Sequence, residues 1–381
     1  VYKRQEKAQI KYANFIKNHP YSKTLQLTKE ERKAQGIPPN KYFEQEYLLE
    51  MNPATGRTHP ENIFTVQQEL KAQRKLQRVP GDAADNMWVE RGPNNVGGRT
   101  RVVMYDPNDV NHKRVFAGGV SGGLWVNNDI TNANSSWTRV GIDENLTVSC
   151  MTVDPNNSQI MYLGTGESYT SGDAVGNGVW KSTDGGTTWA NVYSDTFNPD
   201  IKERLFFIND IKARNNGGTT EVYFGVGGAY YSDGEQWVAY NKTGLYKSTD
   251  GGTNWNKLTV NTPEGTPYEP NDIEIGPDNS IWIGTERNPF GHGGGTILKS
   301  NDATGNTYTA VHTITNARRI EIAVSGTNPN TVYVLAYVRT VDGGGNTIAP
   351  YLSMIKTTDG FTSTTAMGLP SDADNDISSL D

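Results

Sequence analysis

Residues 178–189 read GVWKSTDGGTTW and residues 244–255 read GLYKSTDGGTNW, so nine of the twelve positions are identical. Looser copies of this motif stand at 123–129 (GLWVNND), 297–302 (ILKSND) and 354–360 (MIKTTDG). The five aspartates that the copies share are Asp129, Asp184, Asp250, Asp302 and Asp359, at intervals of 55, 66, 52 and 57 residues. A motif that returns at a nearly fixed period predicts a row of similar structural units.

Each unit contains four short strand-like pieces, and the motif joins the third piece to the fourth. Several first pieces end in turn-forming residues, as in Asp106-Pro107-Asn108 and Asp154-Pro155-Asn156. The first pieces lie at 99–105, 147–153, 209–213, 272–275 and 319–324, and the second at 115–118, 160–164, 222–225, 281–284 and 332–336. Four short strands in each of at least five units predict an all-β fold, a β-propeller, over residues 81–369.

The motif itself has the form Ser-x-Asp-x-Gly-x-x-Trp, which suits a tight hairpin. The aspartate can accept backbone N–H groups across the turn, the glycine permits a positive φ, and the tryptophan covers the turn with apolar surface. We therefore expect a structural role, and not catalysis, for the five aspartates and for Trp189 and Trp255.

This motif is the Asp box, and residues 88–369 resemble the Asp-box (BNR repeat) propellers of sialidases, xyloglucan-cleaving glycosidases, sortilin-type receptors and assembly factors. The whole chain is similar to large secreted proteins of Bacteroidota, many of which are cargo of the type IX secretion system. The resemblance implies a propeller of four-stranded blades with Asp-box hairpins, located outside the cell or on its surface.

Composition changes sharply near Pro80. Residues 1–80 contain 15 basic and 8 acidic residues, only two glycines and no tryptophan, whereas the remaining 301 residues carry a net charge of −14. The leading segment predicts short helices: a capping box at Thr28 and Glu31, a helix from Thr58 to about Gln77, and a strand or helix over 42–51. We expect this basic N-terminal arm to lack a core of its own and to lie on the acidic domain.

Several classes of protein are excluded by composition. No run of 18 apolar residues is present, so we expect no membrane-spanning helix. A net charge of −7 disfavours nucleic acid as a partner. The single cysteine, Cys150, excludes an internal disulfide framework and a CxxC metal site.

Closure of the propeller is left open by the sequence. Residues 88–92 resemble the fourth strand of a blade and would complete the last blade of a ring. The fifth unit has a fourth strand of its own, so we expect the natural protein to continue beyond Asp381 with further blades. A closed ring of five blades, with 88–91 paired to 354–358, is the alternative.

Function is expected on the long connections between second and third strands, at 165–177, 226–243, 285–295 and 337–350. The candidate ligand-binding residues on these connections are Tyr169, Tyr230, Tyr231, Trp237, Arg287, Phe290, His292 and Arg339. Glycoside hydrolysis needs two carboxylates on opposite sides of the scissile bond. Glu167 and Glu286 occupy comparable places in the second and fourth units and are the candidate pair.

The resemblance to known enzymes is incomplete. Sialidases use an arginine triad, and strand alternation lets only one of Arg318 and Arg319 point the same way as Arg99 and Arg101. The resemblance to xyloglucan-cleaving enzymes implies a catalytic Asp directly before the run Ser121-Gly122-Gly123, where this chain has Val120. We therefore expect a secreted, non-catalytic propeller that binds a glycan or a protein. The alternatives are a glycoside hydrolase of sialidase-like architecture and a cargo or component of type IX secretion, in which the arm contacts the secretion machinery.

No cofactor is expected. The weak candidate for a calcium site is the alternating run Asp372, Asp374 and Asp376 within residues 370–381. The run lacks the glycine and the bidentate glutamate of a calcium loop, so an acidic linker, or the start of a further blade, is the alternative.

Overall fold

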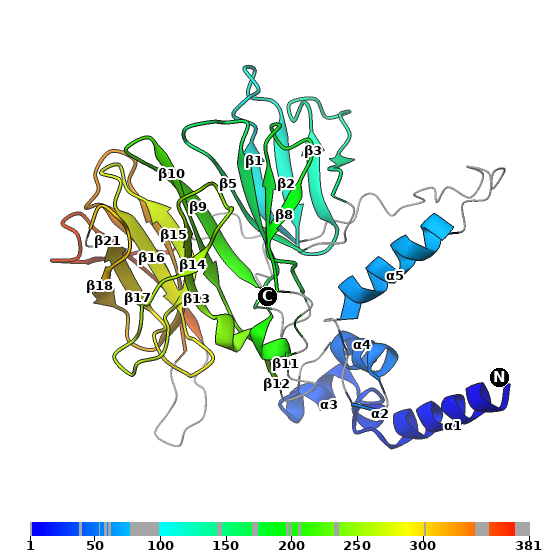
Figure 1. Cartoon of the computed structure of the whole chain (residues 1–381). Helices are drawn as coiled ribbons and strands as arrows, with labels where there is room; N and C mark the ends of the chain where they lie inside the picture. The colour runs from blue at the N-terminus through cyan, green and yellow to red at the C-terminus, as the bar shows by residue number, and fades with distance from the viewer. Residues whose placement is uncertain are drawn as a thin grey trace. The chain divides into compact units, whose positions relative to one another are not determined.

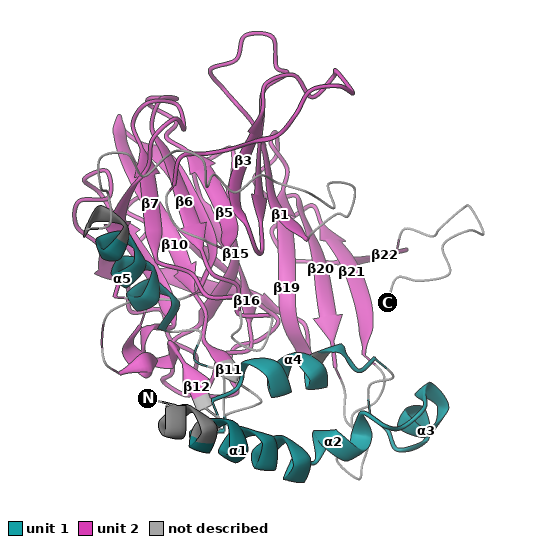
Figure 2. Cartoon of the chain, turned by 90° about the vertical axis from the view of Figure 1, so that its right-hand side faces the viewer, with its two compact units in different colours: residues 1–78, 231–236 teal, residues 79–230, 237–381 magenta. Residues whose placement is uncertain are grey.

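The structure is a computed structural model, and it divides into two compact units, residues 1–78 with 231–236 and residues 79–230 with 237–381 (Figure 2). The residues that it describes are 2–37, 40–52, 54–56, 59, 62–76, 99–142, 147–169, 174–195, 198, 200–204, 207–231, 236–300, 302–339 and 350–369. The expectations for residues 88–92 and 370–381, including the calcium candidates Asp372, Asp374 and Asp376, fall outside these ranges.

The first unit is helical. Its helices are α1 (Tyr2–Asn18), α2 (Tyr21–Thr24), α3 (Lys29–Ala34), α4 (Tyr42–Glu50) and α5 (Ile63–Leu76). The capping box is confirmed: the Thr28 hydroxyl accepts the Glu31 N–H, and the Glu31 carboxylate accepts the Thr28 N–H at 2.7 Å. Residues 42–50, which could have been strand or helix, are helical.

A small apolar cluster holds this unit together. Tyr47, Leu48 and Met51 are buried, and Tyr12, Phe15, Tyr21 and Leu25 pack against them. Beside the cluster, Arg32 is fully buried and donates from both Nη atoms to Glu44 at 2.9 Å. The expectation that the segment has no core of its own is therefore wrong, because its few large apolar residues converge on α4.

The described strands of the second unit form five antiparallel groups of four (Figure 1). Three groups are separate sheets, and the fourth and fifth are joined by a single bridge into one eight-stranded sheet. A two-stranded sheet, Ala229–Tyr231 with Gln236–Val238, is inserted between the second and third strands of the third group. The first group is β1 (Thr100–Tyr105), β2 (Val115–Gly119), β3 (Gly123–Asn127) and β4 (Thr138–Arg139). The second is β5 (Val148–Val153), β6 (Met161–Thr165), β7 (Val179–Ser182) and β8 (Ala190–Tyr193). The third group is β9 (Ile208–Asn216), β10 (Thr219–Val226), β13 (Gly244–Ser248) and β14 (Asn256–Lys257). The fourth is β15 (Glu269–Ile275), β16 (Ile281–Glu286), β17 (Thr296–Ser300) and β18 (Tyr308–Thr313). The fifth is β19 (Ala317–Val324), β20 (Val332–Val338), β21 (Tyr351–Thr357) and β22 (Thr365–Met367).

The first strands of successive sheets pack on one another, β1 on β5, β5 on β9, β9 on β15 and β15 on β19. An asparagine near the start of two of these first strands donates a hydrogen bond to the backbone of the next first strand. Asn209 donates to Pro270 O at 3.1 Å, and Asn271 donates to Ile320 O at 2.9 Å. This arrangement confirms the predicted β-propeller blades, whose first strands line the axis.

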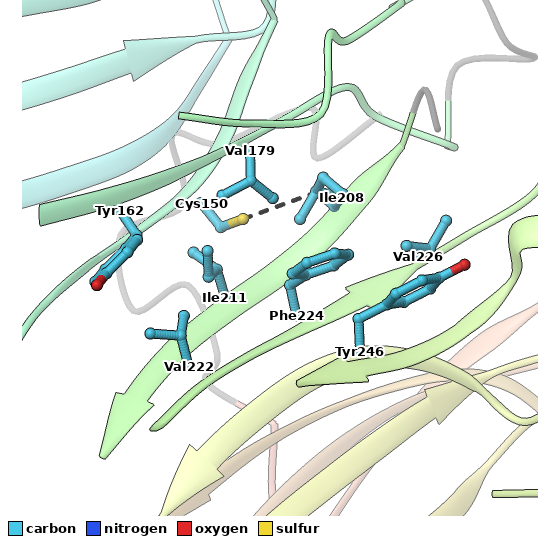
Figure 3. Packing of buried hydrophobic residues seen from close by; sticks show 9 residues of the cluster. All are labelled: Cys150, Tyr162, Val179, Ile208, Ile211, Val222, Phe224, Val226 and Tyr246. Carbon is cyan, nitrogen blue, oxygen red and sulfur yellow. Dashed lines mark hydrogen bonds between the residues drawn. The ribbon is translucent and has the colours of Figure 1, made fainter. Parts of the chain in front are cut away.

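The space between neighbouring blades is filled by apolar side chains. Between the second and third blades, Cys150 and Tyr162 meet Ile208, Ile211 and Phe224 in one buried cluster (Figure 3). Gly164 permits this close approach, since a Cβ there would lie 2.4 Å from Cys150 Sγ and 2.5 Å from an Ile208 methyl group. Burial of such surface contributes about 25 cal/mol per Å² and holds the blades together.

The turns between third and fourth strands are alike in the second and third blades. Asp184 Oδ1 accepts the Thr188 N–H and Asp250 Oδ1 accepts the Asn254 N–H, each at 2.9 Å. Trp189 and Trp255 each donate from Nε1 to a turn carbonyl at 3.0 Å. The hydrogen bonds that the aspartates accept, first of all those from Thr188 and Asn254, lower the pKa of Asp184 and of Asp250 to about 2.

The three looser copies also form turns around their aspartates. Asp359 repeats the pattern with the Ser363 N–H at 2.9 Å, and its pKa falls to about 2. Asp302 accepts the Thr307 N–H at 3.1 Å and the Thr304 and Thr307 hydroxyl groups. Asp129 accepts the Thr131 N–H at 3.1 Å and the Thr131 hydroxyl at 2.6 Å. All five aspartates therefore stabilise bends at equivalent corners of their blades.

Candidate functional site

The polar cluster at the opposite end of the blades lies where first strands begin and second strands end. Glu167 and Tyr169 follow β6, Glu286 ends β16, and Glu269 begins β15. The hairpin register places Glu269 directly opposite Glu286, and a single bridge pairs Glu286 with Arg319 of β19. Two blades thus bring carboxyl groups to this end, and a third brings Arg319.

Glu167 is the ion-paired carboxylate of this region. Its side chain is 1 % exposed, bonds to Arg99 Nη2, and has Oε1 3.5 Å from Arg101 Nε. Arg101 in β1 and Arg99 directly before β1 therefore compensate for the burial of this carboxylate.

Tyr169 connects the pieces of the cluster. Arg101 and Arg319 lie over its ring, at 5.2 and 4.2 Å from the centroid, and its hydroxyl donates to Asn271 Oδ1. Burial raises the pKa of Tyr169 well above its ordinary value. Of the two neighbouring arginines on β19, Arg319 shares the Tyr169 ring with Arg101.

Glu286 differs from Glu167 in having no matching set of donors. It is half-buried, and its Oε2 atom has no hydrogen-bond partner in the described part of the chain. Burial raises the pKa of Glu286 to about 7, although the charges of Arg319 and Arg318 oppose the shift and that of Glu321 adds to it. Glu286 therefore carries a proton for much of the time near neutral pH.

Glu269, opposite Glu286, is the site residue that the sequence reasoning missed. It is 1 % exposed, and burial, with the nearby Glu286, raises its pKa well above the ordinary value. Its Oε2 atom also has no partner among the described residues. Counting outward from the β15–β16 turn pairs 269 with 287, and only the register shift between Pro270 and Asp272 moves the partner to 286, so the sequence carried no direct signal for this pair.

A cavity of about 340 Å³ runs past this cluster. All five first strands line it: Arg101, Val102, Val103, Met104, Ser149, Cys150, Met151, Asn209, Asp210, Asn271, Asp272 and Glu321. Asp210 and Asp272 are engaged structurally, since they accept the Ile273 and Ile322 N–H groups of the next blade at 2.8 and 2.6 Å. Arg101 and Asn271 belong to both the cavity lining and the cluster, whereas Glu167, Glu269 and Glu286 are not among the residues that line the cavity.

The other predicted ligand residues divide into groups. Arg287, Phe290 and His292 share the β16–β17 connection, where Phe290 meets the Tyr240 ring edge-on at 5.7 Å. His292 is held by Asn288 and Thr266, at 2.9 and 3.2 Å. Arg339 follows β20, Trp237 lies on β12 (Gln236–Val238) with 36 % of its surface exposed, and Tyr230 and Tyr231 lie on β11 (Ala229–Tyr231).

Three further findings concern position 120, metal ligands and membrane-spanning helices. Val120, at the position where the resemblance implies an acid, donates its N–H to Arg99 O at 3.0 Å and brings no carboxylate. Within the described ranges, no group of three or more His, Cys, Asp or Glu side chains is arranged to hold a metal ion. No helix in the same ranges is long and apolar enough to cross a membrane.

Known proteins similar to this chain are xyloglucanases. Xyloglucanase Xgh74A of Acetivibrio thermocellus is 30% identical over 171 residues, which is 41% of this chain and 18% of that enzyme. A xyloglucanase of Hypocrea jecorina is 26% identical over 212 residues, covering 51% of this chain and 23% of the enzyme. The chain thus spans about a fifth of the length of these curated relatives. No family model matches it.

Among solved structures, the GH74 enzyme of Niastella koreensis is 20% identical with a TM-score of 0.47, covering 70% of this chain and 38% of that one. YCF48 from Cyanidioschyzon merolae is 14% identical with a TM-score of 0.36, covering 70% and 84%. Both TM-scores are below 0.5, so no conclusion about function is drawn from these two structures.

The sequence matches correct the expected function. A non-catalytic binding module is contradicted, because the curated proteins that share sequence with this chain are polysaccharide-cleaving enzymes. The expectation of a non-catalytic protein relied on Val120, but the absence of an acid at that position says nothing about carboxyl groups that other blades supply. The alternative, a glycoside hydrolase, agrees better with these matches.

Proposed function

We propose that the protein is a glycoside hydrolase that acts on a polysaccharide outside the cell, and that Glu286 is its proton donor. The observation that carries this proposal is the contrast between Glu286 and Glu167. One carboxyl group has a pKa of about 7, while the other is ion-paired with two arginines. Acid-catalysed glycoside cleavage needs one group of each kind.

In this mechanism Glu286 donates its proton to the oxygen of the departing sugar. Glu167, held by Arg99 and Arg101, stabilises positive charge at the sugar carbon or activates the attacking water. The Tyr169 hydroxyl, fixed by Asn271, orients the ring between the two carboxyl groups. The similarity to xyloglucanases supports a glycan as substrate, and we propose that the acidic turns at Asp184 and Asp250 are Asp boxes that only support this site.

The test is hydrolysis of a polysaccharide panel that contains xyloglucan, other neutral β-glucans and acidic glycans. Glu286→Gln should lower kcat/KM about 100-fold or more, because general acid catalysis typically contributes about 10² to 10⁴. Glu167→Gln should cause a similar loss. Glu264→Gln, on the exposed 262–266 turn, is the matched control and should retain the activity. Absence of turnover of every polysaccharide by the unaltered protein would refute the proposal.

A further inference from the structure

Glu269 and Glu286 form a pair of carboxyl groups across the β15–β16 hairpin. The strand register places the two residues directly opposite each other. Opposite residues of antiparallel strands point to the same face of the sheet, and their Cβ atoms lie about 5 Å apart. Two glutamate side chains that start so close together can bring their carboxyl groups into contact.

The Glu269 carboxyl group has a fixed place in the fold. Glu269 is 1 % exposed. A Cβ at Gly227 would lie 2.6 Å from Glu269 Oε1 and 2.7 Å from Asn209 Nδ2, so glycine makes room there for both side chains. The Gly227 N–H donates to Phe207 O at 3.0 Å, which holds this piece of backbone in position. The surroundings of Glu269 are therefore built around its carboxyl group and keep water away from it.

One buried oxygen of each carboxyl group is unused. Glu269 Oε2 and Glu286 Oε2 each have no hydrogen-bond partner among the residues that the structure describes. A buried carboxylate oxygen without a donor costs more free energy than a buried carboxyl O–H, because the charged form loses far more hydration. Glu269 therefore keeps a proton, and the place for that proton is Oε2.

The electrostatic surroundings of Glu269 agree with this protonation state. Burial raises the pKa of Glu269 well above its ordinary value, and the charge of Glu286 raises it further. Hydrogen bonds from the Gly228 N–H and the Asn209 side chain oppose the shift.

Glu286 is the member of the pair on which the charges of β19 act. Burial raises the pKa of Glu286 to about 7, while Arg319 and Arg318 oppose the shift and Glu321 adds to it. Tyr169, which follows β6, stays neutral, since burial and the charge of Glu286 raise the pKa of Tyr169 well above its ordinary value. Because the two arginines favour its ionised form, Glu286 is the member of the pair that ionises first.

We propose that Glu269 is a positioning residue for the proton donor, and that its carboxyl O–H donates a hydrogen bond to the carboxylate that Glu286 becomes during catalysis. This inference rests on the proposed function, in which the Glu286 proton passes to the oxygen of the departing sugar as the bond between that oxygen and the sugar carbon breaks. The electron pair of the broken bond stays on the departing oxygen, Glu286 is left with a negative charge, and Glu269 keeps its own proton. A neutral donor fixed at this place stabilises the charge where it develops and adds no second buried charge.

Two substitutions of Glu269 in the full chain test the inference by kinetics. Glu269→Gln is neutral and keeps a donor, so kcat should stay within about twofold of the unaltered value and the alkaline limb of the pH profile should not move. Glu269→Met fills a similar volume without a donor, so kcat should fall about tenfold or more at an unchanged KM. Its alkaline limb should move up by about one pH unit, because a carboxylate that loses a donor has a higher pKa. Glu264→Met, on the exposed 262–266 turn, is the matched control and should change neither quantity.

Nuclear magnetic resonance of protein labelled with ¹³C at the glutamate side chains gives a readout that does not depend on turnover. The signal that disappears in Glu269→Gln should keep the chemical shift of a protonated carboxyl group up to pH 8. The signal that disappears in Glu286→Gln should titrate at a higher pH in Glu269→Met than in the unaltered protein. Glu269→Gln and this titration decide the matter even where the methionine variant does not fold.

Three outcomes would overturn the inference. They are an alkaline limb of Glu269→Met that coincides with that of Glu264→Met, a limb of Glu269→Gln at least one pH unit lower, which would mean that Glu269 is ionised, and a Glu269 signal that titrates below pH 6. If the signals behave as expected and the unaltered protein cleaves no polysaccharide, only the hydrolase is refuted and the contact between the two carboxyl groups stands. Normal turnover by Glu269→Met refutes only the positioning role.

Discussion

Carboxyl groups at the two ends of the blades behave in opposite ways. At the hairpin corners, Asp184 and Asp250 are exposed, accept several hydrogen bonds and have a pKa of about 2. At the other end, Glu269 and Glu286 lie opposite each other with oxygens that have no partner among the described residues, and burial raises the pKa of both. The number of donors, and not the type of residue, decides whether a carboxyl group supports the fold or keeps a proton for chemistry.

The largest effect that we predict is on the pH dependence of catalysis. A proton donor works only while it is protonated, and burial raises the pKa of Glu286 to about 7. Turnover of the preferred glycan should therefore fall about tenfold for each pH unit above that value. Initial rates between pH 5 and 9 test this, and a rate that stays level up to pH 9 would exclude Glu286 as the donor.

The corner aspartates should affect stability in acid. Their folded-state pKa lies below the ordinary value of 3.8, so their stabilising effect is complete above that value and is lost as the pH falls through about 2. The double variant Asp184→Asn, Asp250→Asn should lose stability at neutral pH and depend less on pH between 4 and 2. Urea unfolding at several pH values measures this, and a profile parallel to that of the unaltered protein would contradict it.

The stability that Glu269 contributes depends on pH in the opposite direction. Its pKa is raised above the ordinary value of 4.5, so its contribution to stability is complete below that value and is lost as the pH rises. Glu269→Gln removes the ionisable group and should stabilise the protein at pH 8 by on the order of 1 kcal/mol. Glu264→Gln serves as the control, and chemical unfolding of both variants at pH 5 and 8 is the measurement. Destabilisation by Glu269→Gln at pH 8 would show that the carboxylate is needed.

The smallest effect is expected at the tryptophans that cover the corners. Trp255→Phe keeps an aromatic ring against Phe224, which lies 4.8 Å away, but loses the hydrogen bond from Nε1 to Gly252 O. The free energy of unfolding should fall by about 1 kcal/mol. Trp189→Phe loses the equivalent bond and should behave alike. A difference of several kcal/mol between the two variants would mean that the two corners are not equivalent.

The fold could be read from the sequence because the information that specifies it is local. Each corner is built within a few residues of its aspartate, so the motif around Asp184 and Asp250 predicted both the turn and the strands beside it. The helical unit was predicted less well, since seven apolar or aromatic side chains spread over 40 residues form its small cluster around Tyr47.

The candidate site could be predicted only in part. Glu167 and Glu286 could be proposed from the sequence because they occupy comparable places at or after the end of a second strand. Glu269 was missed because its burial depends on how β15 pairs with β16.

The repeated contacts of Asn209 and Asn271 have an evolutionary consequence. Each reaches from the first strand of its blade to the backbone of the following blade, a group that every chain possesses whatever its side chains. A duplicated stretch of about 60 residues would carry such a donor and an acceptor together. A new copy would therefore fit between existing ones at once, before any compensating substitution had been selected.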